Sequence, residues 1–402
     1  MPNATLLPLP AIPAGRPHAP LAPVLSVAAL RGAGGTPLPG LLDAPYVHQV
    51  TSGRIAIALA LAQMGVGLGD TVLMPAYHSQ SMIPPVLWRG ATPRFYRVGM
   101  DTAVDLDDIA AKLDISVKAL VVTHYFGFAQ DLTAIRAWCD RHGVQLLEDC
   151  AHCLLGERDG VPVGSVGDYA IGSTMKFYPV YEGGCLVSWR RPMPALALHG
   201  AGAGFEAKAA LAALEHGFAY GRMPQLKKLL ALPLALKDWL WHARKAGSST
   251  PSAPLVPTSS DSSYEFDPRW IDKRSSRFTR LMLRLASRER IATLRRRQYQ
   301  LLADAVQGLP GCRSLHPALP SGTCPWVFPL LVDEPERVFA RLVSEGVPVV
   351  RFGNPLWPGV DANVCPSSAA LSRAVLGFPC HQGLRPAELT WIALRLRAAF
   401  AV

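Results

Sequence analysis

The stretch GVQLLEDCAHCLLGERDGVPVGSVGDYAIGSTMKFYPVYEGG, residues 143–184, decides the fold of this chain. The apolar run at its start is typical of a buried strand, and this strand is predicted to end at Asp149. Two short strands separated by glycines follow and lead to Lys176, which is expected to lie in a turn. A carboxylate at a strand end and a lysine further along suit one cofactor, pyridoxal 5'-phosphate (PLP).

The chemistry of PLP needs groups that this stretch supplies. The cofactor withdraws electrons only while its ring nitrogen stays protonated, and Asp149 is predicted to hold that nitrogen while Lys176 bonds to the aldehyde. His152 is predicted either to contact the phenolic oxygen of the cofactor or to support Asp149. Ser173 is predicted to donate its hydroxyl group to the phosphate, and the pair 183–184 to let the backbone pass close to another segment.

The composition indicates a chain with a large core. Of its 402 residues, 50% are hydrophobic and 17% are charged, so two or more domains are expected. No run of about 18 uncharged apolar residues is present, which predicts that no helix spans a membrane. The first residues lack the basic start and unbroken apolar segment of a signal peptide, so a cytoplasmic location is expected.

The formal net charge of +10 fits an anionic ligand, nucleic acid or an anionic membrane surface. The sequence has no zinc-finger spacing, RNA-binding aromatic motif or long basic run, so nucleic acid is not expected as a partner. A small molecule that carries phosphate is the simplest interpretation. Cys150, His152 and Cys153 form a tight group, but no second cluster completes four ligands, and no metal site is predicted.

The N-terminal part offers a place for the phosphate. Residues 1–48 are rich in proline and glycine and are predicted to form an extended arm, which could reach a partner subunit. Ser52, Gly53 and Arg54 then open a helical pattern. Backbone N–H groups at such a helix start bind anions, and the arginine adds positive charge, so these three residues are predicted to hold the phosphate of the cofactor.

Two further strand ends carry side chains that would lie at the ligand edge of an open α/β sheet. Tyr77 and His78 follow a short strand, and one of the two rings is predicted to stack on the cofactor ring. The alternative is that Tyr77 belongs to the core and His78 is exposed. His124 ends another strand, where a structural role and a catalytic role both remain open.

Strands and helices alternate between residues 71 and 149, which is typical of repeated βαβ units. An α/β fold is therefore predicted, with a large PLP-binding domain at residues 49–303 whose mostly parallel sheet is flanked by helices. A helical insertion with a Ser/Pro-rich linker is expected at about 195–263. Residues 304–402 are predicted to form a smaller α+β domain, with a strand at 347–352 among its elements.

Two basic segments stand out. Residues 226–245 combine lysines with tryptophans and could contact an anionic membrane peripherally, but packing on the domain surface or at a subunit interface is favoured. Residues 269–306 are predicted to form a pair of helices. Their arginines alternate with apolar side chains and are expected to form a solvated or interface face.

The order and spacing of these pieces resemble the DegT/StrS-type sugar aminotransferases, PLP enzymes of the aspartate-aminotransferase fold (fold type I). The resemblance extends from about Ser52 to the C-terminus. Its anchors are Ser52-Gly53, GVGLGD, VLMPAY, THYFG, LEDCAH, GSVGD, Ser173, Lys176, EGG, LRRRQYQLL and LGFPCHQGL.

The resemblance implies that Lys176 bonds to PLP and shifts a proton between substrate and cofactor. It implies that Asp149 holds the ring nitrogen, that His152 flanks the ring, and that Ser52-Gly53 and Ser173 hold the phosphate. It also implies a homodimer with active sites at the subunit interface. The expected reaction moves an amino group, commonly from glutamate, onto a keto-sugar linked to a nucleotide, in polysaccharide, glycolipid or natural-product biosynthesis.

The sequence departs from the family pattern at several of these positions. Arg54 stands where a threonine is usual, AYHSQS replaces an aromatic-rich turn, and Ser173 lies closer to Lys176 than in most members. Two other functions stay open. One is PLP-dependent dehydration of a deoxysugar, against which Lys176 argues because a histidine replaces the lysine in the related dehydratases. The other is a regulatory or membrane-associated protein without turnover.

Overall fold

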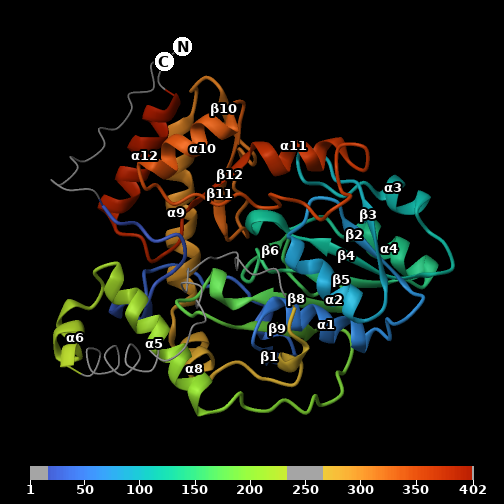
Figure 1. Ribbon diagram of the computed structural model, residues 1–402. Helices are drawn as coiled ribbons and strands as arrows, with labels where there is room; N and C mark the ends of the chain where they lie inside the picture. Colours follow the sequence, from blue (N-terminus) through green and yellow to red (C-terminus); the bar gives the residue numbers. More distant parts are fainter. Residues whose placement is uncertain (1–16, 233–265, 401–402) are drawn as a thin grey trace, which may run out of the picture.

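The computed structural model describes residues 17–232 and 266–400 (Figure 1). Their main feature is a seven-stranded sheet of order β1-β9-β8-β5-β4-β2-β3. Neighbouring strands from β3 to β8 run parallel, whereas β9 and β1 are antiparallel to their neighbours. The prediction of a mostly parallel sheet is therefore confirmed. The strands are β1 (Tyr46–Val50), β2 (Thr71–Pro75), β3 (Thr92–Tyr96), β4 (Val117–Thr123), β5 (Gln145–Asp149), β8 (Tyr169–Ser173) and β9 (Gly184–Ser188).

Helices cover both faces of this sheet, so its central strands are buried on both sides (Figure 1). Leu146 and Leu147 of β5 point into two different cores, one shared with Trp138 and the other with Ile57. This explains why the strand reads as a continuous apolar run rather than an alternating one. The flanking elements are α1 (Gly53–Gln63), η3 (Gln80–Met82), α2 (Ile83–Trp88), α3 (Leu106–Ala111), η4 (Tyr125–Gly127) and α4 (Thr133–His142).

The N-terminal segment joins the sheet earlier than predicted. The extended arm was expected to reach residue 48, but β1 starts at Tyr46 and pairs with β9. Before it lie the short helices η1 (Val27–Leu30) and η2 (Leu41–Asp43), and Leu41 is fully buried. Residues 1–16 of the predicted arm lie outside the described residues.

The C-terminal part forms a second layer around a small antiparallel sheet of order β10-β11-β12. Residues 347–352 were expected to form a strand, but Val350 makes only an isolated bridge to Gly377. The predicted boundary at 303/304 falls inside α9, whose Tyr299 already belongs to the second core. The elements are α9 (Arg288–Val306), β10 (Cys312–Ser314), β11 (Val327–Val332), α10 (Pro335–Ser344), α11 (Pro366–Ala374), β12 (Val375–Pro379) and α12 (Pro386–Phe400).

The remaining described elements are the hairpin β6 (Glu157–Arg158) and β7 (Val161–Pro162) and, further along the chain, α5 (Ala203–Ala219), α6 (Pro224–Leu229), η6 (Pro268–Trp270) and α8 (Arg277–Leu285). Helices α5 and α6 belong to the predicted insertion. Residues 233–245 of the basic segment and the whole Ser/Pro-rich stretch 247–263 lie outside the described residues. In the part of the chain that the structure describes, no helix is long and apolar enough to cross a membrane.

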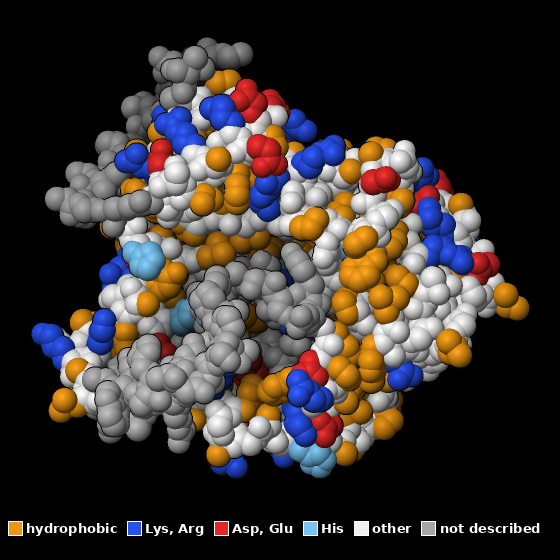
Figure 2. Space-filling view, viewed as in Figure 1, with side chains coloured by type: hydrophobic (Ala, Val, Ile, Leu, Met, Phe, Trp, Pro, Cys, Tyr) orange, Lys and Arg blue, Asp and Glu red, His pale blue; other side chains and the backbone are white. Residues whose placement is uncertain are grey.

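On the face of the molecule that Figure 2 shows, hydrophobic and charged side chains gather in different places. Hydrophobic side chains gather over α2, where Leu87 and Trp88 are exposed, and charged side chains gather over the C-terminal helices. Exposed apolar groups that cluster in this way often mark contact surfaces, although single ones are common on any protein.

Candidate functional site

Lys176 ends a short turn, η5 (Thr174–Lys176), directly after β8. The adjacent strands β5 and β8 place this turn next to the end of β5, where Asp149 lies. Burial lowers the pKa of Lys176 to about 8, and the negative charge of Asp149 works in the opposite direction. The Nζ atom lies 4.7 Å from the ring centre of Trp326. The lysine is therefore held in a dry, partly aromatic environment that favours its neutral amine.

Asp149 is fully enclosed at the carboxyl end of β5. One carboxylate oxygen accepts the N–H of Ala151 at 2.9 Å, and the other accepts the hydroxyl of Thr123 at 3.3 Å. Burial raises the pKa of Asp149, whereas the Ala151 N–H and the charge of Lys176 oppose that rise. The two residues that the sequence singled out are thus brought together and are electrostatically coupled.

His152 packs between rings near the same site. Its ring stacks on Trp326 at 3.9 Å, and its Nδ1 atom accepts the N–H of Phe126 at 3.4 Å. Burial and the nearby Lys176 keep the pKa of His152 well below its usual value. An acceptor Nδ1 leaves the proton of the neutral ring on Nε2. His152 is therefore a neutral donor rather than a cation.

The start of α1 lies against the strands that lead to and from Lys176. Gly184 pairs with Ser173 on one side and with Val50 on the other. A side chain on Gly184 would collide with Ser52 and would lie 2.6 Å from the nitrogen of Gly53. The close approach predicted for the glycine pair is confirmed, and it brings the Ser52–Gly53 peptide beside Ser173.

Ser52 caps α1 with its side chain, since its hydroxyl oxygen accepts the N–H of Ile55 at 3.3 Å. The N–H of Gly53 has no acceptor among the described residues. Arg54, in the first turn of α1, is half-buried. A capped helix start with an available N–H group is the local structure that binds anions.

Tyr77 and His78 lie in different surroundings. Tyr77 is fully buried, stacks on Tyr125 at 5.3 Å and has no hydrogen-bond partner for its hydroxyl group within the described part of the chain. His78 is also fully buried, which contradicts the alternative of an exposed ring. Its Nδ1 lies 2.9 Å from the carbonyl oxygen of Ala76, and its Nε2 accepts the N–H of Trp357 at 3.2 Å. Both nitrogens of His78 are thus occupied by backbone groups.

His124 takes part in a closed network with Glu148. Its Nε2 lies 2.8 Å from a Glu148 oxygen, and its Nδ1 accepts the N–H of Gln130. The same carboxylate also accepts N–H groups of Gly164 and Val166 at 2.9 Å. These bonds saturate the carboxylate and fix the tautomer of the imidazole, so we assign both side chains a structural role.

Cys150 lies beside this pair, so that His124, Glu148 and Cys150 form a compact group of metal-ligating types. Burial holds the pKa of the Cys150 thiol well above its usual value. A protonated thiol and a carboxylate that already accepts several N–H groups are poor metal ligands. Cys153 instead donates to the carbonyl oxygen of Gly127 at 3.4 Å.

Sequence reasoning missed several residues around Lys176. The arginines of the basic helices were expected to form a solvated or interface face, but Arg295 of α9 is fully buried within the chain itself. It donates to the carbonyl oxygens of Lys176 at 2.7 Å and Trp326 at 2.9 Å, and to the side chain of Gln382. A usable signal was its position four residues after the buried Ile291, on the apolar face of α9. Trp326 gave a weaker signal, as a large aromatic residue just before a buried strand.

Comparison with known proteins agrees with this geometry. Residues 38–202 match the DegT/DnrJ/EryC1/StrS aminotransferase family. The match contains Lys176 and Asp149, and over these residues it confirms the family resemblance seen in the sequence. GDP-perosamine synthase of Vibrio cholerae is 31% identical over 153 residues, 37% of this chain and 41% of that protein. L-glutamine:2-deoxy-scyllo-inosose aminotransferase of Streptomyces kanamyceticus is 36% identical over 124 residues, 31% of this chain and 29% of that protein.

The aligned regions thus span well under half of each of these relatives. Solved structures extend the likeness of fold to nearly the whole chain. A putative sugar aminotransferase from Streptococcus pneumoniae in its PMP form has a TM-score of 0.66 at 17% identity, and the alignment covers 94% of this chain and 98% of that one. The C-terminal layer therefore belongs to the same fold, although its sequence has diverged.

Proposed function

We propose that the chain is a PLP-dependent aminotransferase that moves an amino group from glutamate onto a keto-sugar, with nucleotide-linked sugars as the first class to test. The observation that carries this proposal is the buried pair formed by Lys176 and Asp149. A neutral amine and an enclosed carboxylate on adjacent strand ends are the two groups that this chemistry needs.

The residues around this pair fit the cofactor. Asp149 would hold the ring nitrogen, and Lys176 would bond to the aldehyde. Ser52, Gly53, Arg54 and Ser173 would hold the phosphate, where Gly53 has an available N–H group and the backbone of Gly184 leaves no space for a side chain. The buried Tyr77 hydroxyl, which has no partner in the described part of the chain, and the neutral His152 would contact the ring and its phenolic oxygen.

When bound, PLP supplies a ring that stabilises negative charge on the substrate carbon. The chain itself supplies the proton transfers. Because burial lowers the pKa of Lys176 to about 8, the amine is available as a base near neutral pH. Trp326 and His152 shield the amine from water, which keeps the site dry. Arg295 fixes the backbone of Lys176, so the amine returns to the same position in each half-reaction.

The sequence left two alternative functions open. The presence of Lys176 argues against dehydration of a deoxysugar, and its pairing with the buried Asp149 argues against a protein without turnover. The amino donor needs its own test, because the name of the Streptomyces kanamyceticus relative specifies glutamine for that enzyme. Both glutamate and glutamine should therefore be offered.

The decisive experiment is spectroscopic. Purified protein with PLP should show a visible absorbance band that borohydride removes, and glutamate or glutamine should bleach it before reduction. Lys176→Ala should lack the band, whereas Lys208→Ala, which removes an exposed lysine of α5, should keep it. A band that survives in Lys176→Ala would assign the linkage to another lysine. The absence of any band at saturating PLP would overturn the proposal.

The proposal includes a homodimer in the cytoplasm, as the family resemblance implies. Light scattering on the purified protein should then give twice the chain mass of 43.3 kDa. A monomer that nevertheless forms the visible band would show that each chain builds its site alone.

A further inference from the structure

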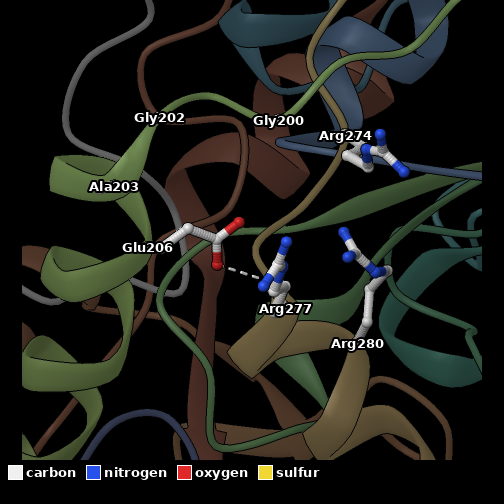
Figure 3. Close-up of a pocket in the computed structure, with 7 residues that line it drawn as sticks. All are labelled: Gly200, Gly202, Ala203, Glu206, Arg274, Arg277 and Arg280. Carbon is white, nitrogen blue, oxygen red and sulfur yellow. Dashed lines mark hydrogen bonds between the residues drawn. The ribbon is translucent and has the colours of Figure 1, made fainter.

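A second site lies beyond the turn that carries Lys176. It is a pocket of about 580 Å³ between the starts of α5 and α8 (Figure 3). The volume lies within the range of small-molecule sites and far exceeds that of a single inorganic ion. The lining residues are Gly200, Gly202, Ala203, Glu206, Arg274, Arg277 and Arg280.

Three arginines make one side of this pocket positively charged. Figure 3 shows the side chains of Arg274, Arg277 and Arg280 gathered on one side of the opening. Glu206 faces them, but its carboxylate accepts the backbone N–H of Arg277 at 2.7 Å. Within residues 17–232 and 266–400, none of the three guanidinium groups forms an ion pair with an acidic side chain. The pocket therefore concentrates positive charge that the described residues do not balance.

The backbone holds these arginines in place. Arg274 donates its N–H to the carbonyl oxygen of His199 at 2.9 Å, and Arg280 donates from its guanidinium group to the carbonyl oxygen of Ser275. Ser276 caps α8 by accepting the N–H of Thr279 at 3.0 Å. The guanidinium group of Arg280 is thus anchored before any ligand arrives, so it loses less side-chain freedom on binding than a free arginine would.

The pocket is coupled to the site around Lys176. Ser276, directly before Arg277, donates its N–H and its hydroxyl to the carboxylate of Glu182 at 2.9 and 2.8 Å. Glu182 lies in the loop between Lys176 and β9, where Gly183 and Gly184 follow. Arg274 also bridges to Val50, three residues before the start of α1. The wall that carries the arginines is thus attached both to the Lys176 loop and to the predicted phosphate-binding turn.

We propose that this pocket binds a diphosphate group. Each guanidinium group can donate two parallel N–H bonds to a phosphoryl group, and a pocket of about 580 Å³ with three such groups has room for more than one phosphoryl group. A diphosphate offers more oxygens on two phosphorus atoms, and arginine recognises such oxygens in bidentate geometry. That the diphosphate belongs to the amino acceptor rests on the function proposed above; the binding site itself does not.

The test uses the full-length protein with saturating PLP, so that the cofactor occupies any site for its own phosphate. Isothermal titration at constant ionic strength compares inorganic pyrophosphate with inorganic phosphate. Arg277→Gln and Arg280→Gln should each weaken pyrophosphate binding by about tenfold or more, the order expected for a lost charge-assisted hydrogen bond. Arg284→Gln is the matched control, because Arg284 is exposed on the same helix and does not line the pocket.

Pyrophosphate that binds more tightly than phosphate, and that loses affinity in Arg277→Gln and Arg280→Gln but not in Arg284→Gln, supports the proposal. Equal affinities in all variants, equal affinities for the two anions, or no binding to the unmodified chain would each overturn it. The visible PLP band is recorded on the same samples. A chain that lacks the band but still binds pyrophosphate through these arginines would refute the proposed function and leave the diphosphate site standing.

Discussion

Burial changes the acid–base properties of Lys176. The lysine loses contact with water, which favours the neutral amine, while the negative charge of Asp149 favours the protonated form. Burial is the larger effect, so the resulting pKa of about 8 lies well below the ordinary value of 10.5. The side chain therefore titrates close to physiological pH, which suits the proton transfers proposed for it.

The rate at which Lys176 bonds to added PLP should follow this titration. Because only the neutral amine attacks an aldehyde, the rate should rise about tenfold per pH unit on the acid side and level off above pH 8. Rapid-mixing absorbance measurements across this range report the midpoint. Asp149→Asn should move the midpoint to lower pH, since the carboxylate raises the pKa of Lys176. A midpoint near pH 10.5 in the unmodified chain would show that the lysine is solvated.

Arg295 is a buried cation surrounded by neutral acceptors. Its guanidinium group donates to three carbonyl oxygens and to Gln382, and it lies 4.4 Å from the ring centre of Phe177. Arg295→Met removes these donors and leaves the buried carbonyl oxygens unpaired. We expect the free energy of unfolding to fall by about 3 kcal/mol or more, measured by urea denaturation.

The matched control for that change is Arg297→Met, two residues along α9, where the arginine is exposed. Its effect should stay within about 0.5 kcal/mol. Similar losses in the two variants would mean that the buried hydrogen bonds of Arg295 contribute little to stability.

At the scale of elements, the contact between β9 and the start of α1 positions the proposed phosphate site. This contact requires glycine at residue 184, because a side chain there would meet the backbone of Ser52 and Gly53. The strand and the helix can approach this closely only because the backbone is bare on that side. The turn that is proposed to hold the anion is thus packed against a strand of the sheet.

Gly184→Ala should therefore push the first turn of α1 away from Ser173. We expect a loss of stability of about 2 kcal/mol from overpacking, together with weaker PLP binding in an absorbance titration. Gly67→Ala is the control, because a side chain at Gly67 would meet nothing within 4 Å. If Gly184→Ala binds PLP as well as Gly67→Ala does, the start of α1 does not hold the phosphate.

The elements also show what a sequence can predict here. The parallel strands and the Asp149/Lys176 pair were predictable, because an apolar run and its terminal polar residues are local signals. Arg295 was not, because its acceptors at Lys176, Trp326 and Gln382 lie far along the chain. The strand expected at 347–352 was wrong for a related reason: β-branched residues favour a strand, but only Val350 meets a partner, Gly377.

At the scale of the whole molecule, contacts across the layers hold the Lys176 turn against the C-terminal part. Gln382 donates to the carbonyl oxygen of Phe177 at 2.6 Å, next to the bond from Arg295 to Lys176. The C-terminal layer thus positions the turn through backbone contacts. Such contacts place few demands on neighbouring side chains, which agrees with a fold that is shared at 17% identity with the Streptococcus pneumoniae structure.

The insertion is attached to the same layer by one buried ion pair. Arg222, after α5, contacts both oxygens of Glu388 in α12 at 2.7 Å and also donates to the carbonyl oxygen of Gly383. Both side chains are only 5% exposed. Burying two charges costs solvation free energy, so their attraction and their extra hydrogen bonds must offset that cost for the pair to persist.

Replacing only one residue of this pair should therefore destabilise the protein more than replacing both. Arg222→Met and Glu388→Leu should each lower the free energy of unfolding by about 3–5 kcal/mol, while the double variant should recover much of that loss. Urea denaturation of the unmodified chain, the two single variants and the double variant gives the four free energies of a double-mutant cycle. Additive losses would show that the two charges do not interact, and other contacts, such as the hydrogen bond from Arg385 to the carbonyl oxygen of Gly221, would then hold the segment after α5 on the C-terminal layer. A recovery in the double variant would instead show that the loss in each single variant comes from leaving one charge buried without its partner.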